Sequence, residues 1–588
     1  MFNRKWGSLT CSVSFMAAAV FLAAFSCACR PVSVFAAADV IVITADEIKR
    51  MNVQKISGVL NQVSGIKAGE SFVSIWGSYK VKVLLDGRPI NDPSSSHNAV
   101  KFDLVSLENI EKIEVLRGEG ALKYGDDASA GVILITTKRI GAFRGNVKSY
   151  RGNFGTSSYS ANCRAIKGSF GVSASLGYDS TDGYKVNNDR KKKRAGGKIE
   201  YLPDEKLSVA FSADYLKDKM GLSGRPEYPT SHSRKESDML SCALSVKAKG
   251  IKSKTFYNEG DTQNRDTDRN INNSMSVRDF GEDLYSSLDM GPWGTINYGA
   301  AFRWGAAESS RFASQREYST SFFAANVFSI KPLPVTFSLG FRGSLYSDFD
   351  NTLNPEVKIS HTGKGWSLSF AYNRVSNTPS FYQRYDKTST KEPNPDLAIE
   401  TADNLHVSFF VEVSPRISLG TSLFYNSIAD RITYVLGKDG IGRYENFGKV
   451  TYRGADLLLS WKIMKELSLK TTYTFLRAMD EDTGLWMACK PRHRVYADLF
   501  FRPIKDFSIV LNMKYESGQY TRSDNKASVE GRAIFNLRFE YSPAWAVLGF
   551  GRFELFGEVN NMANKTYLYG DGLLAPPRTW FCGFNFQF

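Results

Sequence analysis

The chain has 588 residues, 42% hydrophobic and 23% charged, a balance that excludes disordered and collagen-like chains. A mean hydropathy of −0.28 excludes a membrane protein built from helices. Basic residues exceed acidic ones by 15, and aromatic residues make up 13% of the chain, a surplus that the fold must accommodate.

Residues 1–38 have the features of a cleaved signal peptide. Arg4-Lys5 forms a basic start, the stretch 13–28 is apolar and rich in small residues, and no acidic residue occurs in the segment. Small residues fit cleavage after Ala38 or after Ala36. The alternative, a transmembrane anchor, does not fit the shortness of the run. We therefore predict an exported protein.

Charge and cysteine content then narrow the function classes. Of the +15, three charges belong to residues 1–38 and one to residues 39–145, which leaves +11 for residues 146–588. A basic excess suits nucleic acid, anionic lipid or an anionic ligand, and export argues against nucleic acid. The cysteines that remain after cleavage are too scattered for a disulfide scaffold: Cys163, Cys242, Cys489 and Cys582.

Residues 39–145 mix two periodicities. Apolar residues recur at helical spacing over 45–60, opened by Asp46-Glu47. Four β-branched or apolar runs read as strands: 40–43, 80–85, 112–116 and 132–137. We predict a small α/β domain.

From residue 146 onward the pattern changes to alternation with period two, as in Leu207–Tyr215 and Leu467–Phe475. Long polar segments, 182–194, 221–236 and 259–279 among them, alternate with tight turns. The ten turn signals lie near Gly168, Pro203, Gly250, Pro292, Pro332, Gly363, Pro415, Met464, Pro503 and Pro543. Ten short turns on one side, with long loops on the other, give eleven hairpins, or 22 antiparallel strands of about ten residues each.

The C-terminus fits the same architecture. Trp580, Cys582, Phe584, Phe586 and Phe588 alternate with a second set of residues, so they share one strand face. Because backbone groups in lipid must all be paired, the sheet must close into a transmembrane β-barrel. The aromatic surplus then occupies the lipid-facing wall and the interfacial girdles. A barrel of 22 strands is wide enough to need a plug, and the α/β domain is the candidate.

Five segments, in this order, carry a family resemblance: Val83–Asn91 (VLLDGRPIN), Ile110–Lys138 (IEKIEVLRGEGALKYGDDASAGVILITTK), Asn394–Glu400 (NPDLAIE), Glu445–Leu457 (ENFGKVTYRGADL) and Val559–Tyr567 (VNNMANKTY). Together they resemble the TonB-dependent outer-membrane receptors over essentially the whole mature chain. The resemblance implies an N-terminal plug over residues 39–145 inside a barrel formed by residues 146–588.

The chain departs from the family pattern at three positions. Trp76-Gly77 stands where the family often has Arg-Gly, Glu119 where it has Pro, and Ile399 where its NPxLxPE box has Pro. The departure at Trp76 affects the expected loop at the top of the plug.

The segment DVIVIT is similar to the family's TonB box, and its predicted TonB-binding residues are Asp39, Val40, Ile41, Val42, Ile43 and Thr44. We expect an exposed, unpaired, β-prone strand that adds to the edge of a partner's sheet. The alternative is that it forms the first strand of the plug.

Three charged motifs have competing interpretations. Arg117–Gly120 lacks the rest of a phosphate-binding loop, so we predict a tight plug turn, with Arg117 and Glu114 in buried charge pairs with the barrel. The basic run Arg190–Arg194 falls in a predicted outer loop, where lipopolysaccharide contact or simple solvation is expected. Calcium binding by Asp179, Asp182 and Asp189 is disfavoured by that adjacent basic run, so no metal site is predicted.

No catalytic constellation is present, since the five histidines are dispersed without a metalloprotease or hydrolase motif, so we predict neither an enzyme nor a resident cofactor. The resemblance places the ligand where plug apices meet outer loops, and aromatic and arginine side chains there suit a bulky, partly anionic chelate. The candidate ligand contacts are Trp76, Tyr79, His97, Tyr382, Arg384 and Tyr385.

The resemblance therefore implies TonB-dependent active import of a scarce metal chelate, a ferric siderophore or other iron complex, across the outer membrane of a Gram-negative cell. The alternatives are a cobalamin receptor of the same family and, from another class, a passive porin or adhesion protein. The expected partners are TonB with its inner-membrane energising complex, outer-membrane lipids and lipopolysaccharide, and a small-molecule ligand. We expect a monomer that binds no nucleic acid.

Overall fold

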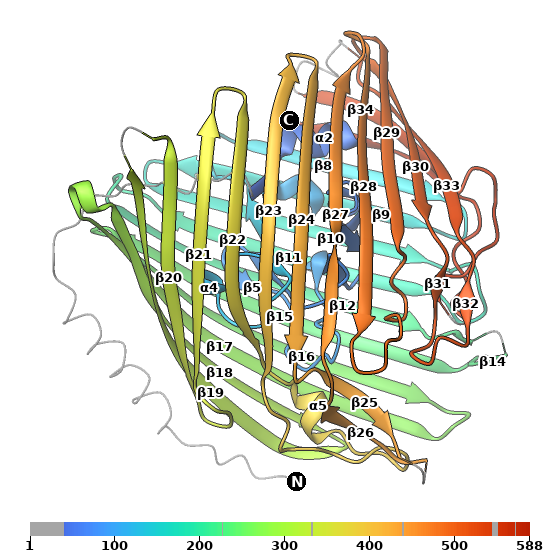
Figure 1. The fold of residues 1–588 in the computed structure, drawn as a ribbon. Helices are drawn as coiled ribbons and strands as arrows, with labels where there is room; N and C mark the ends of the chain where they lie inside the picture. Colours follow the sequence, from blue (N-terminus) through green and yellow to red (C-terminus); the bar gives the residue numbers. More distant parts are fainter. Residues whose placement is uncertain (1–39, 226, 331–332, 438–439, 544–550, 571) are drawn as a thin grey trace.

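The computed structural model describes residues 40–225, 227–330, 333–437, 440–543, 551–570 and 572–588. The predicted signal peptide, residues 1–38, and Asp39 lie outside these residues. Within them, 22 antiparallel strands form one closed barrel around a smaller domain built by the N-terminal part of the chain (Figure 1). The predicted fold class is confirmed.

The first half of the barrel runs from β8 to β19. Its strands are β8 (Arg144–Gly152), β9 (Ser157–Lys167), β10 (Phe170–Thr181), β11 (Arg190–Tyr201), β12 (Leu207–Gly221), β15 (Ser233–Ala248), β16 (Ile251–Asp266), β17 (Ile271–Asp289), β18 (Thr295–Ser309) and β19 (Phe312–Ile330).

The second half runs from β20 to β35. Its strands are β20 (Val335–Tyr346), β21 (Thr352–Gly363), β22 (Trp366–Asn377), β23 (Glu400–Ser414), β24 (Ile417–Ala429), β27 (Val450–Lys462), β28 (Leu467–Asp480), β29 (His493–Ile504), β30 (Phe507–Glu516), β33 (Arg532–Tyr541), β34 (Arg552–Asn560) and β35 (Thr579–Gln587). β35 pairs with β8 and closes the barrel, with Phe581 opposite Gly152.

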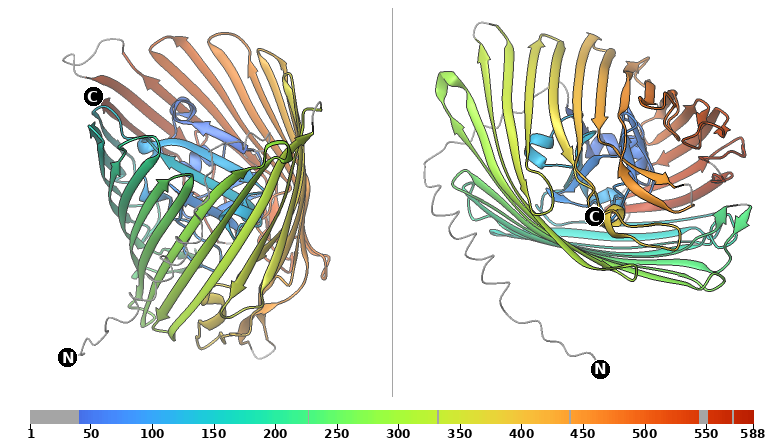
Figure 2. Two further views of the ribbon diagram at one scale, coloured as in Figure 1. Left: turned by 90° about the vertical axis from the view of Figure 1, so that its left-hand side faces the viewer. Right: turned by 60° about the horizontal axis from the view of Figure 1, so that its bottom comes forward.

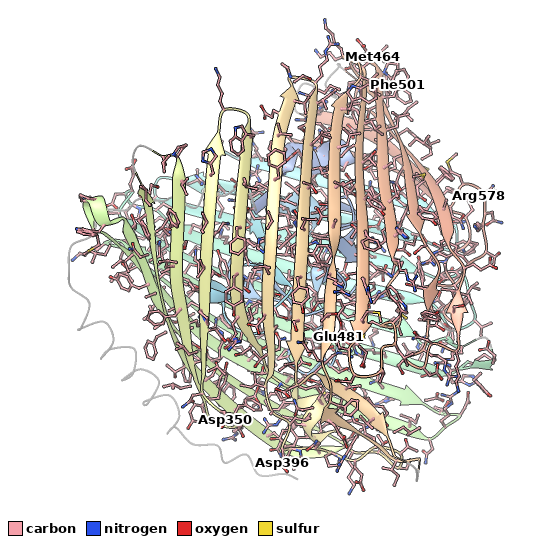
Figure 3. The ribbon with its side chains drawn as sticks, in the orientation of Figure 1. Asp350, Asp396, Met464, Glu481, Phe501 and Arg578 are labelled. Atoms are coloured by element: carbon pink, nitrogen blue, oxygen red, sulfur yellow. The ribbon has the colours of Figure 1, made fainter. Side chains whose placement is uncertain are left out.

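Connections at one end of the barrel are mostly tight turns, as the sequence predicts, whereas those at the other end range from a two-residue turn between β18 and β19 to the long loop between β22 and β23. Of the ten expected turns, Pro332 lies outside the described residues, and the other nine lie at or beside a junction between consecutive barrel strands. Met464 and Phe501 mark the short-turn end in Figure 3, and Asp350, Asp396 and Glu481 mark the opposite, long-loop end. The long loops carry helix α5 (Phe381–Tyr385) and three small hairpins: β13 (Gly224–Arg225) with β14 (Tyr228–Pro229), β25 (Ile432–Leu436) with β26 (Gly442–Asn446), and β31 (Gln519–Tyr520) with β32 (Ser528–Val529).

Several strands are much longer than the ten residues that a bilayer requires. β17 and β19 each have 19 residues. The polar segment 221–236 does contain a loop, which carries the hairpin of β13 and β14. The segment 259–279, in contrast, is mostly strand rather than loop, and 190–194 begins β11. These last two predictions are wrong because a strand that continues beyond the lipid has polar residues on both faces, so composition cannot separate it from a loop.

The outward face of the wall is apolar. On β12, Phe211 and Tyr215 point outward and are 48% and 39% exposed, whereas Ser212 between them is buried. On β35, Trp580 and Phe584 are likewise exposed. Outward aromatic and aliphatic side chains thus cover the surface that meets lipid, which accounts for the aromatic surplus.

The inner domain is an α/β plug. Its five-stranded sheet has the order β1-β6-β7-β4-β5, and a small hairpin of β2 and β3 accompanies it. The strands are β1 (Val40–Thr44), β2 (Ile66–Ala68), β3 (Val73–Ile75), β4 (Val81–Leu85), β5 (Arg88–Pro89), β6 (Ile110–Arg117) and β7 (Gly131–Thr137). The helices are α2 (Ala45–Met51), α3 (Ile56–Leu60), α4 (Ala121–Tyr124) and the short 3-10 turns η1 (Phe102–Leu104) and η2 (Leu107–Asn109), with a further turn η3 (Gly291–Trp293) between barrel strands.

The plug lies within the barrel in each view (Figure 2). Its largest apolar core joins residues of α2, α3 and the plug sheet, such as Leu60 and Ile113, to wall residues such as Phe424 and Leu476. The expected single helix over 45–60 is broken in two, because Asn52 takes a left-handed conformation with φ of 48° and caps α2. No helix in the described ranges combines the length and apolar character needed to cross a membrane.

The segment predicted to be an unpaired TonB box is the edge strand of the plug sheet. β1 pairs antiparallel with β6, from Val40 opposite Leu116 to Thr44 opposite Lys112. Thr44 also caps α2 through a reciprocal pair of hydrogen bonds with Glu47. The expectation that the strand has nothing paired to it is therefore wrong, since only its outer edge is unoccupied by a plug strand.

Candidate functional site

Asp456 on β27 is one of the main polar contacts between wall and plug. Arg117 Nη1 donates to its carboxylate at 2.8 and 2.9 Å, and Trp76 Nε1 donates to it at 2.8 Å. The Trp76 ring stacks on Phe424, with ring centroids 4.5 Å apart and planes 6° apart. The prediction that Arg117 forms a buried charge pair with the wall is confirmed.

Trp76, a predicted ligand contact, lies between plug and wall and also lines a small cavity together with Tyr79, so its contact with a ligand stays a prediction. It is 5% exposed, because its ring stacks on Phe424 and its nitrogen donates to Asp456, both residues of the wall. The tryptophan that replaces the family's usual arginine therefore seats the plug against the wall.

The turn after β6 adds a second buried contact. Gly118 and Gly120 have φ of 64° and 96°, which fits the predicted tight turn. Between them, Glu119 accepts from Lys358 Nζ and lies 2.9 Å from His406 Nε2. Burial alone would raise the pKa of Glu119, but the Lys358 charge and the His406 hydrogen bond outweigh it and bring the pKa to about 2.

Glu114, expected to pair with the wall, instead pairs with Lys112 of its own strand at 2.8 Å. The two residues are separated by one position, so their side chains lie on the same face of β6. This prediction is therefore wrong.

The basic run 190–194 has one face directed into the barrel. Lys192 is buried and pairs with Asp103 of the plug at 2.6 Å, and Arg194 pairs with Asp179 at 2.5 Å. Arg190 pairs with Asp218 and with Glu70 of the plug. The expectation of a solvated outer loop is wrong, because strand alternation turns every second residue of the run inward and only the intervening lysines, at 191 and 193, outward.

The open space on the long-loop side lies between the plug apex and strands β17–β20. We name it the apex cleft, a space of about 1260 Å³ including its open mouth. Plug residues of the segments 89–98 and 125–127 form one side, and the wall and the start of α5 form the other. Its charged lining combines Lys80, Lys82, Arg303 and Arg342 with Asp92, Asp126, Asp127, Asp279 and Glu317.

Many of these charges already have partners. Asp126 accepts from Tyr346 Oη at 2.7 Å, and Asp127 accepts from the Thr378 hydroxyl at 2.9 Å. Arg303 pairs with Asp283 at 2.6 Å. The cleft is thus polar with mixed charge, and the net +11 of residues 146–588 does not make it basic.

The predicted contacts on α5 lie beside the cleft rather than in it. Arg384 is buried, pairs with Glu317 at 3.2 Å and packs against the Tyr385 ring. Lys391 Nζ lies 3.7 Å from the centre of the Tyr382 ring. Their neighbour Phe381 lines the cleft, whereas Tyr382, Arg384 and Tyr385 are absent from its lining.

The two remaining candidates lie on the plug apex. His97 is exposed and its Nδ1 lies 2.8 Å from the Ser96 hydroxyl. Tyr79 lines a second, smaller cavity, where Lys490 Nζ sits 3.7 Å from its ring centre and burial raises the pKa of Tyr79 to about 12.

The sequence reasoning missed the wall residues of the cleft. Arg303 lies on β18, and Arg342 and Tyr346 lie on β20, so these side chains meet on either side of β19 through strand register. Their positions in sequence give no sign of this meeting, because a one-residue slip would turn each side chain to lipid.

Comparison with known proteins assigns the family. The model described as "TonB dependent receptor-like, beta-barrel" matches residues 127–562, and that of the "TonB-dependent Receptor Plug Domain" matches residues 34–132. The vitamin B12 transporter BtuB of Photobacterium profundum is 23% identical over 416 residues, 63% of this chain and 64% of that protein. The siderophore receptor PirA of Acinetobacter baumannii is 33% identical over 110 residues, 16% of this chain and 14% of that protein.

Solved structures share the fold over a larger share of the chain. A mutant of the ferric enterobactin receptor PfeA from Pseudomonas aeruginosa has a TM-score of 0.79 at 17% identity, covering 94% of this chain and 99% of that one. The copper transporter OprC has a TM-score of 0.80 at 14% identity, covering 94% of this chain and all of that one. The chain spans less than two thirds of the two curated relatives named here, 14% of PirA and 64% of BtuB. Since the barrel model alone matches most of the sequence, the chain belongs to the TonB-dependent receptors of the outer membrane.

Proposed function

We propose that the protein actively imports a metal chelate across the outer membrane, with TonB supplying the mechanical work. The observation that carries the proposal is the apex cleft, which is open on the long-loop side and floored by a plug that occupies the lumen. A ligand bound in the cleft cannot pass inward unless the plug moves. The outer membrane holds no ion gradient of its own, so the energy must come from a partner.

The plug contacts argue against the rival interpretation, a passive porin. Three buried or half-buried charge pairs join plug to wall through Arg117, Glu119 and Asp103. Breaking such pairs without compensation costs several kcal/mol each, so a permanently open pore does not fit. The family is one of receptors and transporters, which is consistent with no enzymatic activity.

For the substrate, a ferric siderophore or other iron complex is the first candidate and cobalamin the second. Relatives named as siderophore receptors and as vitamin B12 transporters both match the chain. Tyr346 and Phe349 offer aromatic surface in the cleft, and Arg303 and Arg342 offer cationic edges, a combination that suits a bulky chelate with polar groups. The barrel's net charge gives no reason to prefer either, because many of its cations pair with wall and plug carboxylates.

For the partner, we propose that TonB engages the segment 39–44, of which the structure describes β1. The outer edge of β1 is free of plug strands, and Val42 is 44% exposed, so a partner strand has main-chain groups to pair with. We further propose that Lys191 and Lys193, the outward members of the basic run, meet lipopolysaccharide phosphates.

The test measures ligand binding and uptake by a variant whose cleft is blocked by a large side chain. Ser319 lines the cleft on β19, whereas Ser314 on the same strand is exposed and is not part of that lining. We expect Ser319→Trp to weaken binding of the cognate chelate at least tenfold by filling the cleft, and Ser314→Trp to leave it unchanged. Radiolabelled ferric siderophores and cyanocobalamin are compared on iron-starved and cobalamin-starved cells. If neither class is taken up by the unchanged protein, the substrate proposal is wrong.

A further inference from the structure

Four cations surround a single carboxylate where the plug meets strands β29, β30 and β33, and a fifth cation, Lys490, lies nearby. We name this group the basic cluster: Lys67 of the plug, Lys490 in the loop before β29, Arg494, Lys514 and Arg532, with Glu516. Arg532 Nη2 lies 2.5 Å from the Glu516 carboxylate, Arg494 3.4 Å, Lys514 3.5 Å and Lys67 4.0 Å. One negative charge is thus shared by four cations.

Lys490 adds a fifth positive charge. Within the described part of the chain, no acidic side chain lies within ion-pair distance of its ammonium group, which donates to the Gly77 carbonyl. Burial and the charges of Lys67 and Arg431 hold the pKa of Lys490 well below its usual value. Burial likewise lowers the pKa of Lys67 to about 8, against the opposing effect of Glu516.

Lys67, Lys490 and Arg494 border a small cavity, whereas Lys514 and Arg532 are not part of its lining. The space is about 360 Å³ including its open mouth, and its lining also includes Tyr79 but no carboxylate. Arg532 of the same cluster is 5% exposed, and its Nη1 nitrogen makes no hydrogen bond within the described residues. Excess positive charge and an unused guanidinium donor therefore lie where little water is available.

The cavity adjoins the apex cleft through one plug residue. Asn98 lines the cleft, and its amide donates to the carbonyl of Tyr79, which lines the small cavity, at 3.1 Å.

We propose that the basic cluster is an oxyanion subsite that takes one carboxylate or phosphate group. Guanidinium and ammonium groups bind such oxyanions through charge-assisted hydrogen bonds, and a bound anion would offset the repulsion among cations that Glu516 alone leaves uncompensated. The cavity is too small for a whole chelate, so the proposal is limited to a single group of this kind. The assignment of this group to the imported ligand rests on the proposed function. The expected binding of a carboxylate or phosphate to the basic cluster does not depend on it.

The test uses the purified full-length protein in detergent, titrated calorimetrically with inorganic phosphate and with citrate at constant ionic strength. We expect saturable binding of at least one of them to the unchanged protein, and at least a tenfold loss of affinity in Lys490→Gln, whose side chain forms no ion pair in the described structure. Lys526→Gln, an exposed loop lysine, is the matched control and should bind as the unchanged protein does. Lys67→Gln provides a second variant if Lys490→Gln folds poorly.

Phosphate binding alone assigns a phosphate subsite, and citrate binding alone a carboxylate subsite. Binding of neither, or equal affinity in the Lys490, Lys67 and Lys526 variants, overturns the proposal. The apex-cleft variant Ser319→Trp separates the two hypotheses, because it should lose chelate binding while it keeps phosphate or citrate binding. Oxyanion binding without uptake of any chelate would leave the subsite standing and the import proposal refuted.

Discussion

Asp456 shows how a single wall residue can hold the plug. It is 1% exposed and accepts hydrogen bonds from both Arg117 and Trp76 of the plug. Sequence reasoning assigned Trp76 to the ligand because tryptophan at a loop apex usually marks a contact surface. The indole nitrogen donates to Asp456, and the ring stacks on Phe424. Both barrel residues lie more than 300 positions away in the chain, so no local pattern predicts these contacts.

We expect Asp456→Asn to destabilise the seating of the plug by about 3 kcal/mol, because the substitution leaves the Arg117 guanidinium buried beside a neutral amide. The measurement is the rate of limited proteolysis of the plug in the intact protein. Asp403→Asn is the matched control, since Asp403 pairs with Arg374 in an exposed position and such a pair contributes about 0–1 kcal/mol. Equal protection of the plug in both variants would contradict the bracing role.

At the scale of single strands, β11 directs alternate residues of the basic run 190–194 toward the plug and toward the outer face. Lys192 is buried against Asp103 of the plug, whereas Lys193 is exposed on the outer face. We expect Lys192→Gln to loosen the plug by about 1–3 kcal/mol, because it leaves a half-buried carboxylate without its partner. Lys193→Gln should not affect proteolytic protection, although it should weaken retention on immobilised lipopolysaccharide. If Lys193→Gln loosens the plug as much as Lys192→Gln, the strand register is wrong.

The edge strand β1 allows a sharper test of energy transfer. Val42 lies opposite Glu114 in the β1–β6 pair, so a cysteine at each position can tie the two strands together. If TonB must peel β1 away from β6, the oxidised Val42→Cys/Glu114→Cys protein should bind its chelate normally but lose uptake, and a reductant should restore uptake. Full uptake by the oxidised protein would show instead that a partner strand adds to the free edge without peeling.

The architecture follows from sequence periodicity, whereas the site does not. Alternation and ten turn signals were sufficient to predict 22 strands, because lipid forces every strand to pair and the barrel to close. The apex cleft depends on which residues of β18–β20 face inward at the same height, as Arg303 and Arg342 do. That depends on shear and register, which vary with strand extensions beyond the bilayer, such as the 19 residues of β19.

At the scale of the whole molecule, several plug carboxylates pair with cations of the wall, in addition to the plug cations that pair with wall carboxylates. Glu119 pairs with Lys358, Asp103 with Lys192 and Glu108 with Lys148. For each carboxylate burial opposes ionisation, but the neighbouring cation outweighs burial and lowers the pKa. A group whose pKa falls on folding contributes stability above its unfolded pKa and loses it as pH falls toward the folded value.

The seating of the plug should therefore be constant from about pH 8 to pH 5 and weaken only below the ordinary carboxylate pKa of 4.5, toward the value of about 2 held by Glu119. Proteolytic protection of the plug after brief exposure to each pH, with an acid-stable protease, measures this. Glu119→Gln should be less protected at neutral pH and show a shallower decline in acid, because one of the titrating contacts is already absent. A loss of protection between pH 7 and 5 would contradict this account.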